Sequence, residues 1–336
     1  MLQLFQSIFG ATRDGAAPYP AELTERAIER AVDGTDPRLR ALSGYRKKLR
    51  AAVMRAIDHV MALVDGLPPA LELSLRSYGI DPEVTAYFAS TEHLREVLSI
   101  DRELNRWRTS QGDGERVVAL LLMLQQERQV FGTALEGEIL RRDVAQTTVS
   151  FAKHRLVDPS GTLDDTRRLL KRRAFDHLLT LALARIATAD AERGALERDR
   201  RLLQRKLAAL QAGQWGFDAA AAEERPDPPT LQGQLEEIEL QLKALDIGAG
   251  LLAAHLDVVV DVLTRSEQHF WSARTSLIVD RLGVKQTRAG ALAPEIELTV
   301  LHNAAGQRLI ARLVGIERAA LPPPRDWLRE AQRYLG

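Results

Sequence analysis

The sequence predicts a mainly helical protein: a helical bundle, a projecting antiparallel coiled-coil hairpin and a small C-terminal antiparallel β-sheet. Three observations support this class. Helix-forming residues dominate the composition, and only 5% of the residues are aromatic. Leucines recur at steps of four and three on both sides of a segment rich in Gly and Pro. Several short β-branched segments near the C-terminus indicate strands.

The 336 residues are enough for about two domains of ordinary size. We expect an apolar N-terminal segment over 1–19, a helical bundle core over 20–189, the hairpin over 190–248, and a last region over 249–336. This last region should contain a helix, the small sheet and a C-terminal helix.

The N-terminal segment is apolar but lacks the basic region and the cleavage site of a secretory signal, so we expect it to remain in the mature protein. Phe5 and Phe9 recur there at helical spacing. They are candidate contacts with the body of the protein or with a partner, and disorder or lipid contact are the alternatives.

Helix starts are marked where an Asp precedes a Pro, at Asp36-Pro37 and Asp81-Pro82. A stripe of apolar residues at steps of three and four, from Leu49 to Val64, predicts a long helix after the first of these. The strongly apolar run Glu115–Val130 is predicted as an internal helix that completes the bundle. Its longest unbroken apolar stretch has eight residues, whereas a membrane-spanning helix needs about 20, so no transmembrane helix is expected.

Extended structure is predicted where β-branched residues cluster or alternate with polar ones. The segments are Val144–Phe151, Ser276–Leu282, Ile296–Leu301 and Arg308–Ile316. A final short helix is expected around Trp327 to Leu335, after three consecutive prolines.

The hairpin is predicted from two seams of equal length. The first is Leu196, Arg200, Leu203, Leu207 and Leu210, and the second is Leu231, Leu235, Ile238, Leu242 and Leu245. Two such seams joined by a loop should fold back on each other. The helix before the loop carries a net charge of plus three and the return helix minus three, so we expect the charges to pair across the hairpin. Trp215 and Phe217 lie in the loop, where they either fold back on the seam or contact a partner.

Several kinds of chemistry are excluded or disfavoured. The chain has no Cys, which removes thiolate nucleophiles, iron–sulfur clusters and Cys-ligated zinc. No HExxH pair, phosphate-binding loop or nucleophile elbow is present. Gly248–Ala253 matches a relaxed dinucleotide-binding pattern, but a helix rather than a strand is predicted before it. We therefore expect no metal, nucleotide or other cofactor.

The 46 basic and 46 acidic residues balance, so any anion binding must come from a local patch. The best candidate is a basic cluster on one side of a predicted helix. It consists of Arg167, Arg168, Lys171, Arg172 and Arg173. It either binds phosphate or an acidic partner, or it forms salt bridges within the protein.

We therefore predict a non-enzymatic cytoplasmic interaction or scaffold protein, which binds a protein partner or a second copy of itself through the coiled-coil arm. Nucleic-acid or anionic-surface binding through the Arg167–Arg173 cluster is the alternative, and peripheral membrane contact is not expected. A second alternative is an enzyme whose site is assembled from dispersed residues.

Overall fold

The computed structural model describes residues 19–110, 114–136, 139–211, 228–245 and 250–325. The chain divides into two compact units, each built from separate stretches of sequence. The first unit contains residues 57–175 and the chain from 266 onward. The second contains residues 17–56 and 176–265. Phe5, Phe9, Trp215, Phe217 and the helix predicted near the C-terminus lie outside the described residues.

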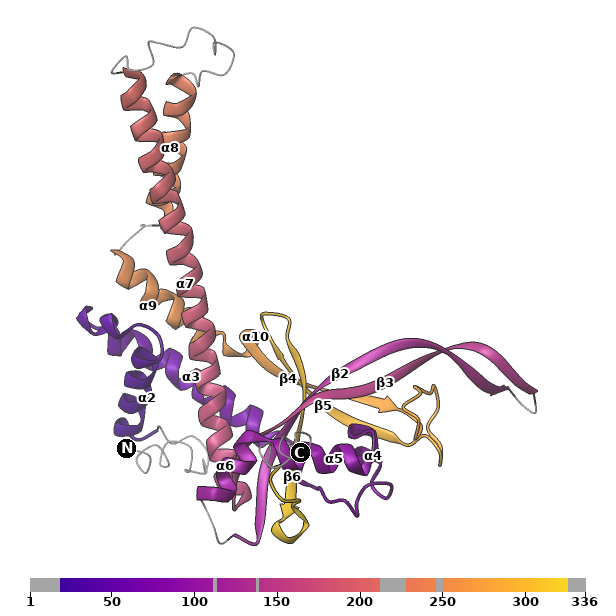
Figure 1. Cartoon of the computed structure of the whole chain (residues 1–336). Helices are drawn as coiled ribbons and strands as arrows, with labels where there is room; N and C mark the ends of the chain where they lie inside the picture. Colours follow the sequence, from indigo (N-terminus) through magenta and orange to yellow (C-terminus); the bar gives the residue numbers. More distant parts are fainter. Residues whose placement is uncertain (1–18, 111–113, 137–138, 212–227, 246–249, 326–336) are drawn as a thin grey trace, which may run out of the picture. The chain divides into compact units, whose positions relative to one another are not determined.

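The first unit is built on a six-stranded sheet in the order β3–β2–β6–β5–β4, with β1 paired to β6 (Figure 1). The pairing of β1 with β6 is parallel, and the other pairings are antiparallel. The strands are β1 (Leu71–Glu72), β2 (Arg116–Glu136), β3 (Ile139–Ser160), β4 (Phe270–Ile278), β5 (Glu295–Asn303) and β6 (Arg308–Glu317).

This sheet shows that the predicted fold class was wrong. The run Glu115–Val130, predicted as a bundle helix, forms most of β2, which lies in the sheet between β3 and β6. Its side chains alternate between two hydrophobic clusters: Val117 and Leu121 belong to one, and Leu120 belongs to the other. A strand buried on both faces has no polar face, so its sequence resembles that of a buried helix.

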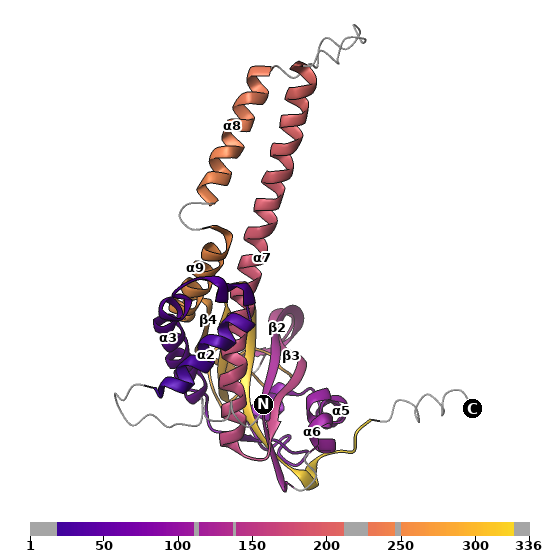
Figure 2. The ribbon, with the colours of Figure 1, turned by 90° about the vertical axis from the view of Figure 1, so that its left-hand side faces the viewer.

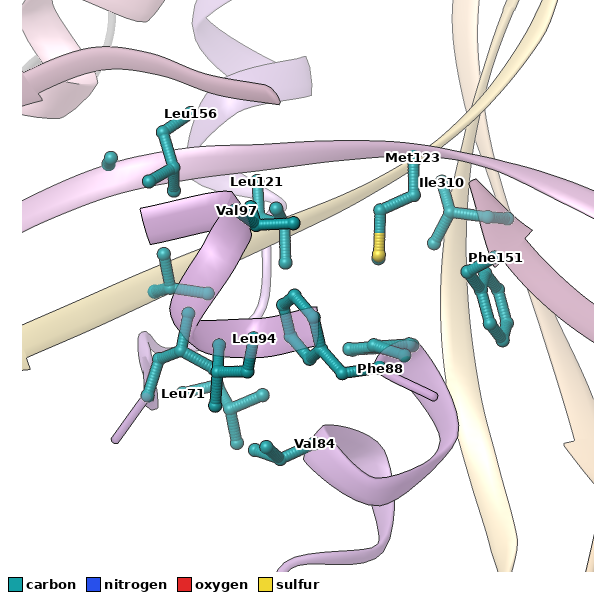
Figure 3. Packing of buried hydrophobic residues seen from close by; sticks show 14 of the residues in the cluster. Leu71, Val84, Phe88, Leu94, Val97, Leu121, Met123, Phe151, Leu156 and Ile310 are labelled. Atoms are coloured by element: carbon teal, nitrogen blue, oxygen red, sulfur yellow. The ribbon is translucent and has the colours of Figure 1, made fainter. Parts of the chain in front are cut away.

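Two hydrophobic clusters hold the first unit together, and alternate residues of β2 belong to one cluster or the other. The larger cluster joins the sheet to α4 (Pro82–Tyr87), α5 (Thr91–Ile100) and α6 (Arg102–Ser110) (Figure 3). The smaller cluster joins it to the end of α3 and the start of α7. The helices expected to form a bundle with β2 therefore pack on the sheet instead.

Three bulges interrupt the pairing of β2 with β3, and each places one extra residue on β3. The register shifts lie between Val118 and Leu120, between Leu122 and Leu124, and between Gly132 and Ala134 of β2. Opposite them, Asp158, Lys153 and Asp143 have φ angles of 51°, 55° and 57°. A bulged residue with positive φ is a recognised way to bend and twist a strand pair.

The second unit is helical. Its elements are α2 (Ala21–Asp33), the 3₁₀ helix η1 (Pro37–Ala41), the first part of α3 (Tyr45–Asp65), α7 (Leu163–Gln211) from residue 176 on, α8 (Pro228–Leu245) and α9 (Gly250–Thr264). Ion pairs tie them together: Arg30 to Asp176, Lys48 to Asp257 and Arg185 to Asp261. Asp36 starts η1 rather than a long helix, and α3 begins only at Tyr45.

Two short helices complete the described chain. They are α10 (Ser266–His269) and η2 (Arg318–Ala320), both in the first unit. Over the described ranges, no helix combines the length and the apolar character that crossing a membrane requires.

Candidate functional site: the helical hairpin and its base

The most distinctive feature of the second unit is a hairpin formed by α8 and the part of α7 beyond Asp190. The two helices run side by side in opposite directions (Figures 1 and 2). Leu203, Leu231 and Leu242 are buried, although their sequence neighbours are exposed. The buried positions follow the spacing of four and three residues, so one narrow apolar seam joins the helices.

Arg200 occupies a seam position and is partly buried. Its guanidinium Nε is buried and has no hydrogen-bond partner among the described residues. A buried donor without an acceptor costs about 1–3 kcal/mol, so Arg200 weakens the seam locally.

The charges of the hairpin are not arranged as the sequence predicts. In the described part of the hairpin, none of Arg198, Arg201 and Arg205 is paired with a carboxylate of α8. Arg201 instead donates to the backbone oxygen of Glu197 at 3.1 Å. These arginines are exposed, as are Glu236 and Glu237 on α8. The outer surfaces of the two helices therefore carry opposite charges that face solvent.

At the base of the hairpin, a buried histidine lies between two carboxylates. His255 of α9 places Nδ1 at 2.9 Å from Asp36 and Nε2 at 2.9 Å from Asp190. Its side chain is only 3% exposed, whereas that of Asp190 is 41% exposed. The three side chains join η1, α7 and α9 at the point where the hairpin begins.

Each ring nitrogen of His255 faces a carboxylate oxygen, which is a hydrogen-bond acceptor. Arg38 donates to both carboxylate oxygens of Asp36, from Nε to Oδ1 at 3.0 Å and from Nη2 to Oδ2 at 2.9 Å, and Oδ2 is also the oxygen that His255 contacts. These bonds from Arg38, with the one from His255, hold the pKa of Asp36 well below its usual range, although burial opposes them.

The cluster is suited to stabilising the base rather than to catalysis. Both ring nitrogens of His255 are occupied by protein groups, and the ring is almost fully enclosed. A general base must reach the proton that it removes, which this imidazole cannot do without opening the fold. We therefore interpret the base as a support that fixes α7 and α9 beneath the hairpin.

Sequence analysis did not single out this cluster. Asp36 was assigned only as a cap, and the structure confirms that it accepts from the N–H of Arg38 at 3.0 Å. His255 and Asp190 are 65 residues apart, so no local spacing connects them. The one available signal was His255 itself, a polar residue within the apolar helix α9.

The basic cluster on α7 is largely engaged in ion pairs within the first unit. Lys171 is buried against Asp65 at 2.8 Å, and Arg168 contacts Asp165 at 2.7 Å. Arg173 contacts Asp158 at 2.7 Å and Glu103 at 3.1 Å. Arg172 also has a partner, whereas the Nε of Arg167 is buried and has no hydrogen-bond partner among the described residues. This geometry favours the salt-bridged alternative over an open anion site.

The other described histidines do not form a metal centre. His154 lies 2.8 Å from the backbone oxygen of Tyr87, and burial lowers its pKa to about 4. His59 lies 2.7 Å from the backbone oxygen of Phe270, and His302 stacks on Trp271. Within the described ranges, no three His, Asp or Glu side chains are arranged to hold a metal ion.

Described residues of the first unit line two surface cavities. One of about 180 Å³ is lined mainly by apolar residues that include Ile80, Val279 and Leu292. The other, of about 280 Å³, is lined by Gln125, Glu127, Val300, Arg308 and Ile310. Thr85 and Asp280 both line the first cavity. The Thr85 hydroxyl donates to the backbone oxygen of Asp81 at 2.9 Å, and the Asp280 carboxylate accepts from the N–H groups of Leu282 and Val284 at 2.9 Å.

The fold and the site together define an α+β protein with a helical hairpin on a buried polar base. The chain matches no protein-family model, and no curated protein or solved structure matches it.

Proposed function

We propose that this protein is a non-enzymatic interaction or scaffold protein that acts through the helical hairpin. The observation that carries the proposal is the exposure of apolar side chains on the outer surfaces of the hairpin. Leu202 is 52% exposed and Leu240 is 67% exposed, although both belong to long helices with a buried seam. Each leucine lies beside exposed charges, Arg201 on α7 and Glu237 on α8, and a surface that combines apolar and charged groups suits a partner of complementary charge.

The base supports this role. His255, Asp36 and Asp190 hold the start of the hairpin in place. The outer surfaces of the hairpin are therefore ordered before a partner binds. Surfaces held in place before binding lose less conformational entropy when a partner is bound. We place the protein in the cytoplasm, since a chain without Cys has no disulfide that would need an oxidising compartment.

The test compares the full chain with a variant whose residues Ala195 to Asp246 are replaced by a short Gly-Ser linker. This variant keeps Asp190 and His255, so the base is intact. Circular dichroism and thermal unfolding should show that the rest of the protein is folded.

Both proteins are then used to capture binding partners from a native lysate. We expect the full chain to retain partners that the variant without the hairpin does not. Equal capture by both proteins would contradict an interaction role for the hairpin.

A further inference from the structure

The outer surface of α7 carries a basic stripe around one leucine. Arg198, Arg201, Leu202 and Arg205 are exposed and follow one another at steps of three, one and three residues, which places them on one side of the helix. Arg205 lies midway between the seam positions Leu203 and Leu207. Two residues correspond to about 200° of helical rotation, so this stripe faces away from α8.

The outer surface of α8 carries the complementary stripe. Gly233, Glu236, Glu237 and Leu240 are exposed and follow one another at the same steps of three, one and three. Leu240 lies midway between the seam positions Ile238 and Leu242, so this stripe faces away from α7. Each stripe therefore combines one exposed leucine with charges: three arginines surround Leu202, and two glutamates precede Leu240, which is followed three residues later by exposed Lys243.

The two leucines also lie at similar heights along the hairpin. The end of α7 and the start of α8 are at the same end of the hairpin (Figures 1 and 2). Counted from there, Leu202 is nine residues from the end of α7 and Leu240 is twelve residues from the start of α8. The difference of three residues corresponds to about 4.5 Å, which is less than one helical turn.

We propose that the basic stripe of α7 binds the acidic stripe of α8 on a second copy of this chain. Leu202 then packs against Leu240 of the neighbouring hairpin, and Arg205, three residues after Leu202, faces Glu236 and Glu237, which precede Leu240. The helices in this contact run antiparallel, as they do within one hairpin. This inference rests on the proposed function, because it names the partner that the hairpin binds.

The geometry also determines the kind of assembly. The two stripes are on opposite outer sides of the hairpin, so a copy that uses its α7 stripe still has a free α8 stripe. Such contacts are heterologous and produce rows or rings rather than closed pairs. Because the contact combines exposed charges with a small apolar area, it should be weak and sensitive to salt.

Charge reversal tests the contact in the full chain. One variant carries Arg201→Glu and Arg205→Glu, which makes both stripes acidic. The other carries Glu236→Arg and Glu237→Arg, which makes both stripes basic. A control with Arg95→Glu and Arg106→Glu makes two equivalent changes at exposed sites on α5 and α6. Sedimentation velocity measures association at about 0.05 M and about 0.5 M salt.

We expect the natural chain and the control to form assemblies larger than dimers at low salt and to dissociate at high salt. Each stripe variant alone should associate at least about tenfold more weakly than the natural chain, because like charges then face each other. An equal mixture of the two variants should recover association, since acidic stripes then meet basic ones. This recovery also shows that the variants are folded.

Three results would overturn the proposal: a natural chain that stays monomeric, association that neither stripe variant weakens, or variants that weaken association but do not recover it when mixed. A closed dimer that does not grow with concentration would overturn the heterologous arrangement. These outcomes are separate from the lysate experiment, because a monomeric chain whose hairpin still captures another protein would leave the proposed function intact.

Discussion

The helical hairpin of α7 and α8 and the β-hairpin of β2 and β3 are held together by different interactions. Both carry the chain outward and back. The helical hairpin satisfies its backbone hydrogen bonds within each helix, so its two halves meet only through the side chains of the seam. The β-hairpin pairs its backbone from Leu124 opposite Ala152 to Glu136 opposite Ile139. Pairing of the two helices therefore depends on which side chains form the seam. Pairing of the two strands depends much less on the identity of their side chains.

The two hairpins also differ at their bases. The β-hairpin begins in an apolar core that includes Leu121, Met123 and Phe151 (Figure 3). The helical hairpin begins at the polar cluster of Asp36, Asp190 and His255. One base is held by packing and the other by charge, and substitutions at each base should separate these contributions.

The largest effect is expected from Leu121→Ala in the apolar base. Leu121 is fully buried in β2, so the substitution should lower the free energy of unfolding by about 4 kcal/mol. Gln129→Ala, in the exposed part of the same strand, should change it by less than about 0.5 kcal/mol. Denaturant unfolding measures both, and equal losses would show that packing at the base does not anchor the β-hairpin.

The next effect is expected from His255→Ala in the polar base. The substitution removes both hydrogen bonds that the imidazole makes to Asp36 and Asp190, which should cost about 3 kcal/mol. Hydrogen exchange of the α9 amides reports on this region. The control is Asp257→Ala, on the same helix as His255. It breaks an exposed pair with Lys48 of α3 and should cost less than about 1 kcal/mol. A similar loss for both would contradict the role of the buried cluster.

Acidification should destabilise the β-hairpin base through His154. Burial lowers the pKa of His154 to about 4, and His93 acts in the same direction while the Tyr87 carbonyl opposes it. The neutral ring is therefore favoured in the folded state. Stability from this group is present above the ordinary value of 6.5 and is lost as the pH falls from 6.5 towards 4, by about 3 kcal/mol.

His154→Gln tests this prediction because the amide can still donate to the Tyr87 carbonyl but does not titrate. Unfolding free energies of the two proteins should converge as the pH falls through this window. Parallel curves would show that His154 is not the source of the acid sensitivity. The segment from Asp190 to Asp246 contains no His, so hydrogen exchange in the helical hairpin should not follow this titration.

The smallest effect is expected within the seam, where Arg200→Leu should stabilise the helical hairpin by about 1 kcal/mol. The substitution removes a buried Nε without a described partner and extends the apolar seam. Gln204→Leu, on an exposed position of the same helix, should have almost no effect. Slower hydrogen exchange in α8 would support the prediction, whereas faster exchange would show that Arg200 contributes to the pairing.

The parts of the fold that could be predicted are those in which one local pattern determines the structure. Asp81 followed by Pro82 marks the start of α4, and its carboxylate accepts from the N–H of Glu83. The predicted strands Ile296–Leu301 and Arg308–Ile316 lie within β5 and β6. In each case neighbouring residues carry the signal.

The sheet as a whole could not be predicted, because its central strands do not show a regular alternation of apolar and polar residues. β2 is buried on both faces and shows no alternation. In β3, Phe151 and Leu156 face the same hydrophobic cluster although they are five residues apart. An uninterrupted strand would place them on opposite faces, and the bulge at Lys153 restores them to the same one. The cluster at His255 was missed because its residues meet only in the folded chain.

The bulges of β3 also determine which changes in length this strand can accept. If one residue were deleted at Lys153, the pairing with β2 would become regular and Phe151 would keep its face, because it would then lie four residues from Leu156 in an uninterrupted strand. A single deletion in a regular part of the strand, such as at Val149, would instead move the residues on its tip side to the opposite face. A deletion of two neighbouring residues would keep the faces and shorten the ribbon. Insertions and deletions in this part of the gene should therefore be tolerated in pairs of codons, and single ones only where a bulge can absorb them.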